Sequence, residues 1–406
     1  MSLLVTDDAL AAFALAPGFS CAAGACGLKK SGAPDLALVW SERPCAAAGV
    51  FTTNRVQAAP VVLDRETLAS SAGRIRGVLA NAGCANAVTG ERGMADARRM
   101  QALGAGAIGA SPDELLVLST GVIGVFLDLA KLERGVGALR GPGALRTPAD
   151  VARAITTTDT RPKVAARAAR LEGGGVTIAG FAKGAGMIHP NMATMLAVVT
   201  TDARIAPVPL ERALRAAIER SFNRISVDGD MSTNDTVLVL ASGAGPAVAP
   251  REESAFTDAL ADACASLARQ IARDGEGATR LVELRVTGAA SERQAHRVGD
   301  AIACSPLVKT AIHGNDPNWG RILAAAGYSG EAIEPAKVRL WFGERDEVQL
   351  LDRGLPTPFD AAHASALLAL DPAVVRLDLG LGDGTATLWT CDFSAEYVRI
   401  NAEYTT

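Results

Sequence analysis

Short apolar runs rich in Val, Leu and Ile recur along the whole chain, and stretches with a helical period lie between them. Runs of this length with many β-branched residues are typical of buried strands. The predicted strands are residues 36–40, 77–81, 115–118, 176–181, 194–200, 236–241, 281–286, 338–342 and 374–379. The predicted helices are residues 209–222, 252–273, 306–312 and 319–326. The alternation of the two patterns predicts a mixed α/β fold (α/β or α+β).

The helix over 252–273 has the clearest pattern, since Phe256, Leu260 and Leu267 fall at three- and four-residue steps on one face. The helix over 209–222 opens with a proline in its first turn, a position that proline favours.

Glycine and proline predict three connections. The stretch 135–148 resembles a linker, and Gly173-Gly-Gly175 resembles a surface loop. The segment 380–384 lies between two strand patterns, which fits a hairpin turn. Its G-x-G-x-G spacing lacks the dinucleotide fingerprint and a following helix, so a Rossmann site is not expected.

Charge and composition exclude several function classes. The net charge of -4 gives no basic field for nucleic acid. Acidic residues precede the short apolar run 9–17, unlike a secretory or transit signal, and no run could span a bilayer, so a cytoplasmic location is expected. The odd count of seven cysteines suggests small buried side chains. Cys21 and Cys26 have four residues between them, but there is no second pair at metal spacing, so no metal site is predicted.

The most informative residue is Thr194, which follows the small Ala193 where a glycine-punctuated loop meets an apolar run. An ordinary strand threonine is the simplest interpretation. The functional interpretation is that the Ala193–Thr194 bond is cut. Thr194 would then be a nucleophile whose own α-amine, with a pKa near neutral pH, serves as its base.

Several blocks resemble the ornithine acetyltransferases, the glutamate N-acetyltransferase family of arginine biosynthesis. Lys183-Gly-Ala-Gly-Met and Met192-Ala-Thr-Met-Leu-Ala resemble the family's self-cleavage region. Further matching blocks are 49–54, 118–124, 157–160, 221–224, 227–230, 273–277, 314–321 and 401–406. Two positions depart from the family pattern, Cys84 and Met231, where asparagine and threonine are frequent, and neither has an assigned chemical role.

The resemblance implies mixed sheets flanked by helices and self-cleavage into an alpha fragment, 1–193, and a beta fragment, 194–406. These fragments would stay associated, as a heterotetramer or larger form. It implies acetyl transfer from N2-acetylornithine to glutamate through an acetyl-Thr194 intermediate, without a cofactor. Some family members also use acetyl-CoA as donor, and the residues leave this open.

The family's site residues match positions here. Thr120 and Gly121 match the oxyanion hole, although a turn after the run 115–118 is the simpler interpretation from sequence alone. The substrate-binding positions match Thr157, Lys183, Thr194, Glu276, Asn401 and Thr406. A cation suits the substrate α-carboxylate, and an anion suits the δ-amine of ornithine.

His189, five residues before Thr194, is interpreted as a loop residue, because the N-terminal amine already supplies a base. His313 lies beside the block 314–321 and receives no role. Two other interpretations stay open: a self-cleaving amidase or aminopeptidase in which water receives the acyl group, and an uncleaved binding or structural protein. No nucleic-acid or membrane partner is expected.

Overall fold

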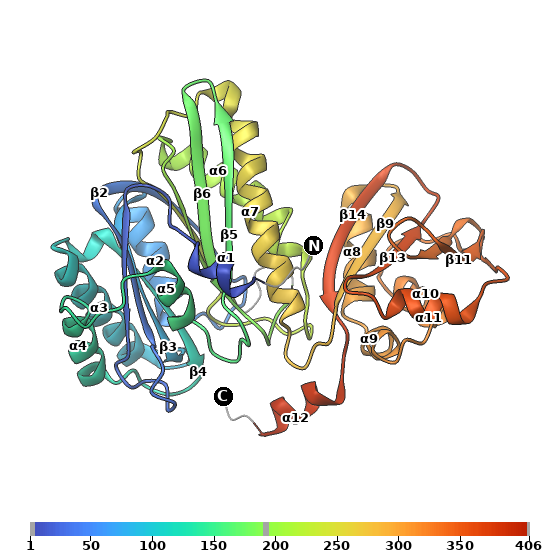
Figure 1. Ribbon diagram of the computed structural model, residues 1–406, viewed down its shortest axis with the longest axis horizontal. Helices are drawn as coiled ribbons and strands as arrows, with labels where there is room; N and C mark the ends of the chain where they lie inside the picture. Colours follow the sequence, from blue (N-terminus) through green and yellow to red (C-terminus); the bar gives the residue numbers. More distant parts are fainter. Residues whose placement is uncertain (1–4, 190–194, 404–406) are drawn as a thin grey trace.

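The computed structural model describes residues 5–189 and 195–403, which form two lobes (Figure 1). Each lobe is built on its own sheet. The larger lobe contains the strands β1 (Phe19–Gly24), β2 (Leu36–Phe51), β3 (Arg74–Cys84), β4 (Leu115–Val122), β5 (Lys163–Leu171), β6 (Gly174–Lys183), β7 (Leu196–Thr201) and β8 (Thr236–Ala241). The smaller lobe contains β9 (Leu281–Ala289), β10 (Arg339–Phe342), β11 (Val348–Asp352), β12 (Leu355–Pro356), β13 (Ala373–Asp378) and β14 (Gly384–Cys391).

The sheet of the larger lobe has the order β4-β3-β2-β8-β7-β6-β5, with β1 also paired to β2. The first part of the long β2 pairs with β1 and β3, and its last part, Ala46–Phe51, pairs with β8. The pairs β3–β4 and β7–β8 are parallel, and the others are antiparallel.

The two halves of this sheet pack on each other. Alternate side chains of β7 and β8 point into two different hydrophobic cores, because successive strand side chains point to opposite faces. We call the core between the two halves of the sheet the inner core, and the core between the sheet and helices α6 and α7 the outer core. Leu196, Val198 and Leu238 belong to the inner core with residues of β2 to β4, whereas Val199 and Val237 belong to the outer core.

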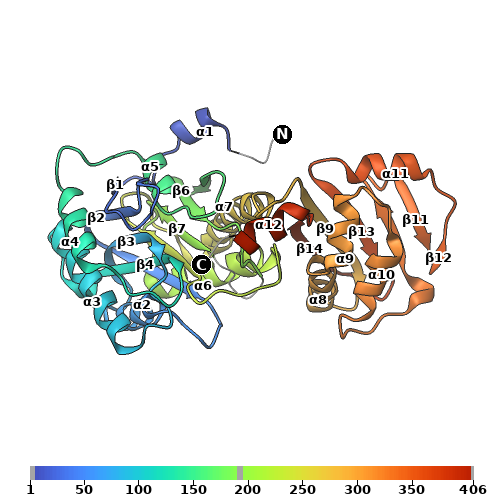
Figure 2. The same cartoon turned by 90° about the horizontal axis from the view of Figure 1, so that it is seen from below.

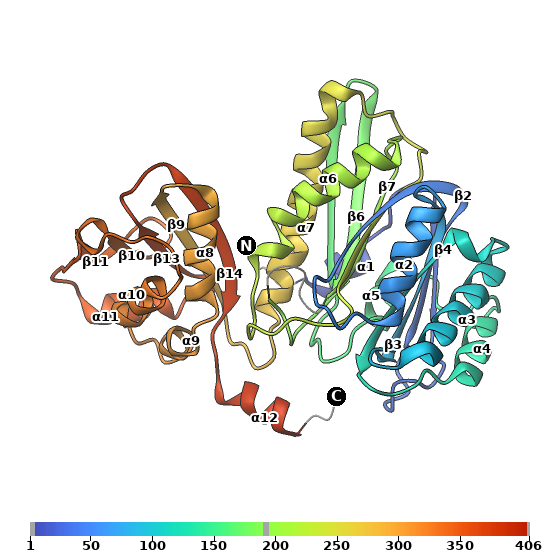
Figure 3. The same cartoon turned by 180° about the vertical axis from the view of Figure 1, so that it is seen from behind.

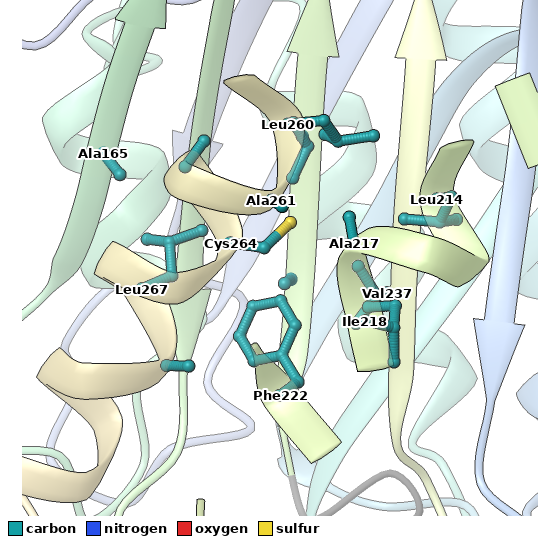
Figure 4. Packing of buried hydrophobic residues seen from close by; sticks show 14 of the residues in the cluster. Ala165, Leu214, Ala217, Ile218, Phe222, Val237, Leu260, Ala261, Cys264 and Leu267 are labelled. Atoms are coloured by element: carbon teal, nitrogen blue, oxygen red, sulfur yellow. The ribbon is translucent and has the colours of Figure 1, made fainter. Parts of the chain in front are cut away.

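Helices cover both outer faces. The helices of the larger lobe are α1 (Asp7–Ala11), α2 (Ala59–Ser70), α3 (Gly90–Ile108), α4 (Leu129–Ala138), α5 (Pro148–Ala154), α6 (Pro207–Glu219) and α7 (Glu253–Arg273). Figure 3 shows α6 and α7 lying across β6 and β7. Between these helices and the sheet, Phe222, Cys264 and Leu267 pack beside Ile218 with no exposure above 1% (Figure 4).

The smaller lobe has the sheet order β12-β11-β10-β13-β9-β14. Its helices are α8 (Glu292–Ala303), α9 (Pro306–His313), α10 (Trp319–Gly327) and α11 (Ala361–Leu368). After β14 the chain leaves this lobe, and α12 (Ala395–Glu403) runs back beneath the larger lobe (Figures 1 and 2). In the part of the chain described, no helix combines the length and apolarity that crossing a membrane requires.

Most predicted elements are confirmed. Six of the nine predicted strands lie wholly within observed ones. Two more, 338–342 and 374–379, extend one residue beyond β10 and β13, and the ninth, 194–200, overlaps β7 from residue 196. All four predicted helices are present as α6, α7, α9 and α10. All seven cysteines are free thiols and five are buried, as expected.

Two connections were predicted wrongly. Segment 380–384 does not close a hairpin, because β9 lies between β13 and β14 and pairs with both. The stretch 135–148 is not simply a linker: its first residues complete α4. Gly135 is packed there, since a Cβ would lie 2.3 Å from the Cβ of Cys26.

Candidate active site

Six of the predicted site residues line one cavity of about 110 Å³. They are Thr120, Gly121, Thr157, Lys183, Glu276 and Asn401, and further lining comes from Ala85, Ile123, Thr158, Gly186, Met187, Ser232, Thr233 and Asn234. These residues come from β4, from β6, from loops of the larger lobe and from α12. Ala193, Thr194 and Thr406 lie outside the described residues. The proposed nucleophile is therefore not among the described parts of the site.

Gly121 sits where β4 departs from regular pairing with β3. Cys84 is opposite both Thr120 and Val122, which marks a bulge, and bulges redirect the backbone next to functional sites. Gly121 has φ +130°, and a Cβ there would lie 2.4 Å from the carbonyl carbon of Gly83. Only glycine fits this position without displacing the neighbouring strand.

Lys183 ends β6 inside the cavity, with only 3% of its surface exposed. Its Nζ donates to Thr120 Oγ1 at 3.3 Å. Burial lowers the pKa of Lys183, and the nearby carboxylate of Asp159 opposes that shift. The cavity therefore holds an ammonium group beside a hydroxyl, and desolvation weakens the hold of the ammonium on its proton.

The Thr157–Thr160 block is organised by Asp159, a residue that the sequence analysis did not select. The Asp159 carboxylate accepts from Thr157 N at 3.0 Å, from Gly184 N at 2.7 Å and from Lys163 Nζ. Burial alone would raise the pKa of Asp159, but the charges of Lys163 and Lys183 and the hydrogen bonds from Lys163 and Gly184 hold it well below its ordinary value. Lys163 also pairs with Asp274. This buried network fixes the loop that carries Thr157.

Glu276 brings a carboxylate to the same cavity. Its N–H donates to Ala185 O at 2.9 Å, and a Cβ on Gly186 would lie 2.4 Å from its Oε2, so Gly186 leaves room for the side chain. Asn401 Nδ2 on α12 donates to that Oε2 at 2.9 Å. The C-terminal helix thereby places an amide against an acid of the larger lobe.

A second buried aspartate, Asp235, follows the cavity residues Ser232–Asn234 and was also missed. Its Oδ1 accepts from Met195 N at 3.0 Å, and its Oδ2 has no hydrogen-bond partner among the described residues. Burial raises the pKa of Asp235 well above its ordinary value. Asp235 lies close enough to Lys183 to favour the charged form of that lysine. The first described residue after the predicted cut is thus tied to a carboxyl beside the cavity.

Sequence reasoning missed Asp159 because it stood in a matching block with no assigned role, and missed Asp235 because it lies outside the matching blocks. The only available signal was an acidic residue next to a predicted strand or inside Thr-Thr-Asp-Thr. The departures have structural roles: Cys84 Sγ donates to Val125 O at 3.4 Å, and Met231 Sδ lies 3.5 Å from Thr53 Oγ1. His313 pairs with Asp392 at 2.7 Å.

The comparisons agree with the resemblance. A sequence model described as the ArgJ family matches residues 20–406. The arginine biosynthesis bifunctional protein ArgJ of Symbiobacterium thermophilum is 50% identical over 98% of this chain and 99% of its own length. That of Geobacter sulfurreducens is 50% identical over 96% and 99%. A crystal structure of the protein of that name from Bacillus halodurans is 46% identical, covering 50% of this chain and 97% of its own, with a TM-score of 0.48. The chain therefore belongs to the ArgJ family and is an acyltransferase of arginine biosynthesis.

Proposed function

We propose that this enzyme transfers an acetyl group from N2-acetylornithine to glutamate through an ester on Thr194. The observation that carries the proposal is the cavity itself, which combines the cation Lys183, the anion Glu276 and the pair Thr120–Gly121. An α-carboxylate pairs with an ammonium group, and an amine pairs with a carboxylate. One cavity can therefore bind the α-carboxylate of ornithine at Lys183 and its δ-amine at Glu276, while Thr120 and Gly121 face the reacting carbonyl.

The position of Thr194 in the chain supports its role. Consecutive Cα atoms are about 3.8 Å apart, so residue 194 lies one peptide unit from Met195. The N–H of Met195 is bound to Asp235, which lies near Lys183.

In the first half-reaction the α-amine of Thr194 takes the hydroxyl proton, and Oγ1 attacks the acetyl carbonyl. The Gly121 N–H and the Thr120 hydroxyl stabilise the resulting oxyanion, a contribution that is often the largest single one in acyl transfer. The C–N bond then breaks, the leaving amine takes the proton back, and ornithine departs. Glutamate repeats these steps in reverse and leaves as N-acetylglutamate.

The same hydroxyl would mature the chain. Attack of Thr194 on the Ala193 carbonyl forms an ester by an N-to-O shift, and water hydrolyses it to give fragments 1–193 and 194–406. The fragments would remain associated, because β6 lies before the cut and β7 after it, and the two strands pair with each other.

Mass spectrometry of the purified protein tests the proposal. We expect two fragments, the second beginning at Thr194, and acetyl-enzyme with acetylornithine alone. Thr194→Ala should give a single full-length chain with no transfer, and Thr200→Ser, a change in the same region, should still be cut. Normal fragments from Thr194→Ala would refute the nucleophile.

Two further assays define the reaction. Acetylglutamate formation from acetyl-CoA without acetylornithine would establish the second donor. Hydrolysis that outpaces transfer at saturating glutamate would instead support an amidase.

A further inference from the structure

Three metal-binding side chains converge outside the acetyl-transfer cavity: His189, Asp300 and Cys304. His189 Nδ1 lies 3.3 Å from Cys304 Sγ and 3.9 Å from Asp300 Oδ1, and Sγ lies 3.7 Å from the same Oδ1. Among the described residues they are the one set of three such groups with this closeness. None of them lines the cavity that holds Lys183 and Glu276.

The fold determines the position of each side chain. Asp300 and Cys304 are four residues apart at the end of α8, so they share one face of the helix, and the Cys304 N–H closes the last turn on Asp300 O at 3.0 Å. His189 follows Ile188, whose N–H donates to Asp228 at 2.9 Å and whose carbonyl accepts from Val227 N at 2.8 Å. These bonds hold the loop that carries His189 to residues 227 and 228 of the larger lobe. The neighbouring Ser226 N donates to Trp389 O of β14 at 3.1 Å, which brings this region against the smaller lobe.

The arrangement is not that of a cysteine nucleophile. In a nucleophile relay the base contacts the nucleophile with one ring nitrogen, and a third group orients its other nitrogen. Here the thiol and the carboxylate both approach the same atom, His189 Nδ1. Three donor atoms that lie within 4.8 Å of one another suit a shared central ion.

We propose that His189, Asp300 and Cys304 form a binding site for a divalent transition metal, with Zn²⁺ the best match. Zinc takes thiolate, imidazole and carboxylate ligands in tetrahedral geometry with bonds of about 2.0–2.3 Å, which places ligand atoms about 3.4–3.6 Å apart. The three observed separations lie within a few tenths of an ångström of that range.

The chemistry of the donor set agrees with this assignment. A thiolate and a carboxylate balance the charge of a dication, and neutral imidazole adds the third bond. The side chains of His189 and Asp300 are 23% and 30% exposed, so an ion can enter and water can complete the fourth position. Sequence spacing could not predict the site, because His189 and α8 lie in different lobes.

The metal site would link the two fragments that the proposed cut leaves without a covalent bond between them. His189 belongs to fragment 1–193, whereas Asp300 and Cys304 belong to fragment 194–406. Metal binding should therefore stabilise their association, because a ligand that binds only the assembled state favours that state. The site itself requires neither the cut nor acetyl transfer, so its failure would leave the proposed function intact.

Zinc titration of the untagged, chelator-stripped full chain against a competing chromophoric chelator tests the proposal. We expect one Zn²⁺ per chain. Co²⁺ should give the charge-transfer absorption of a thiolate ligand. His189→Gln and Cys304→Ser should each weaken Zn²⁺ binding by more than about 100-fold, beyond the effect of losing an outer-shell partner. The matched controls His363→Gln and Cys26→Ser should bind as the wild type does.

Circular dichroism should show that the variants are folded. If Cys304→Ser does not fold, Asp300→Asn and His189→Gln supply the test, since both side chains are partly exposed. Absence of bound Zn²⁺ in the wild type would overturn the proposal. Binding that persists in His189→Gln would also overturn it, and would leave a simple Cys304–His189 hydrogen bond.

Discussion

The two lobes bury their polar groups very differently. The larger lobe buries Lys163, Lys183 and Asp235 around the cavity, whereas the core of the smaller lobe is apolar throughout β10, β11 and β13. The buried Lys309 and Asp392 of the smaller lobe lie at its junction with the larger one. Burying a charge costs free energy unless it is paired. The comparison indicates that the larger lobe buries charged groups around the proposed active site, at a cost in stability, while the core of the smaller lobe is packed with apolar side chains.

Breaking the charge network should have the largest effect. Asp159→Asn leaves Lys163 and Lys183 less compensated in a buried site, so we expect the free energy of unfolding to fall by about 3–5 kcal/mol. The pKa of Asp159 is lowered, so its stabilisation is complete above the ordinary pKa of about 4 and is lost as pH falls further. Urea unfolding at several pH values should show a difference that is largest at neutral pH and shrinks in acid.

Asp64→Asn is the matched control, since Asp64 is equally buried. Burial raises its pKa, and its Oδ1 accepts only from Val117 N at 2.8 Å among the described residues. A raised pKa means that the stability it contributes is lost as pH rises, the opposite sign to Asp159. Asp64→Asn should therefore not destabilise at neutral pH. Equal losses for the two variants would contradict a special role for the Asp159 network.

A truncated side chain in the apolar core should lower stability without lowering activity. Phe342 on β10 is 1% exposed within the small-lobe core, and Phe342→Ala should cost about 3–5 kcal/mol through lost burial and a cavity. Thermal unfolding should shift downward while the turnover of folded enzyme stays near the wild-type value. A matching loss of turnover at low temperature would show that this lobe does more than support the site.

Gly121→Ala should act mainly on the reaction. The added Cβ would displace the backbone at the proposed oxyanion hole, and loss of one such donor lowers turnover by about 100- to 1,000-fold. Turnover with acetylornithine and glutamate measures the effect. Gly106→Ala on α3 meets no neighbour within 4 Å and should keep full activity. Normal turnover in Gly121→Ala would exclude the oxyanion role.

The smallest effect is expected at α12. Asn401→Ala removes a hydrogen bond to the charged Glu276, a contact worth about 1.5–3 kcal/mol when fully formed and less at this exposed position. We expect KM for acetylornithine to rise by up to about tenfold with little change in kcat. Arg399→Ala removes ion pairs only within α12 and should leave KM unchanged. A fall in kcat for Asn401→Ala would assign it to the chemical step.

The sequence predicted best where one physical signal dominates. The run at residues 236–241 is confirmed as β8 to the residue, since it is β-branched, apolar and buried on both faces. Helix α3 was missed, because its glycines and arginines dilute the apolar period. The hairpin at 380–384 was wrong, because local turn chemistry cannot reveal that β9 inserts between its flanking strands.

The candidate site likewise contains residues that the sequence could identify and residues that it could not. The family resemblance selected residues such as Thr120, Lys183 and Glu276, which the fold brings to one cavity. Asp159 and Asp235 could not be selected, because their importance comes from burial and from partners far away in sequence. The convergence of His189 with α8 likewise exists only in three dimensions.

The chain enters and leaves the smaller lobe at adjacent points. Asp392 accepts from Thr279 N at 2.7 Å and from Arg280 N at 3.1 Å, and Ser394 Oγ donates to Gly277 O at 2.6 Å. Everything between forms a closed loop, and doubling the length of such a loop costs only about 0.6 kcal/mol. In evolutionary terms, this lobe can gain or lose segments far from these hydrogen bonds. Glu276 and Asn401 lie just outside the closed loop, so their contact with each other is kept.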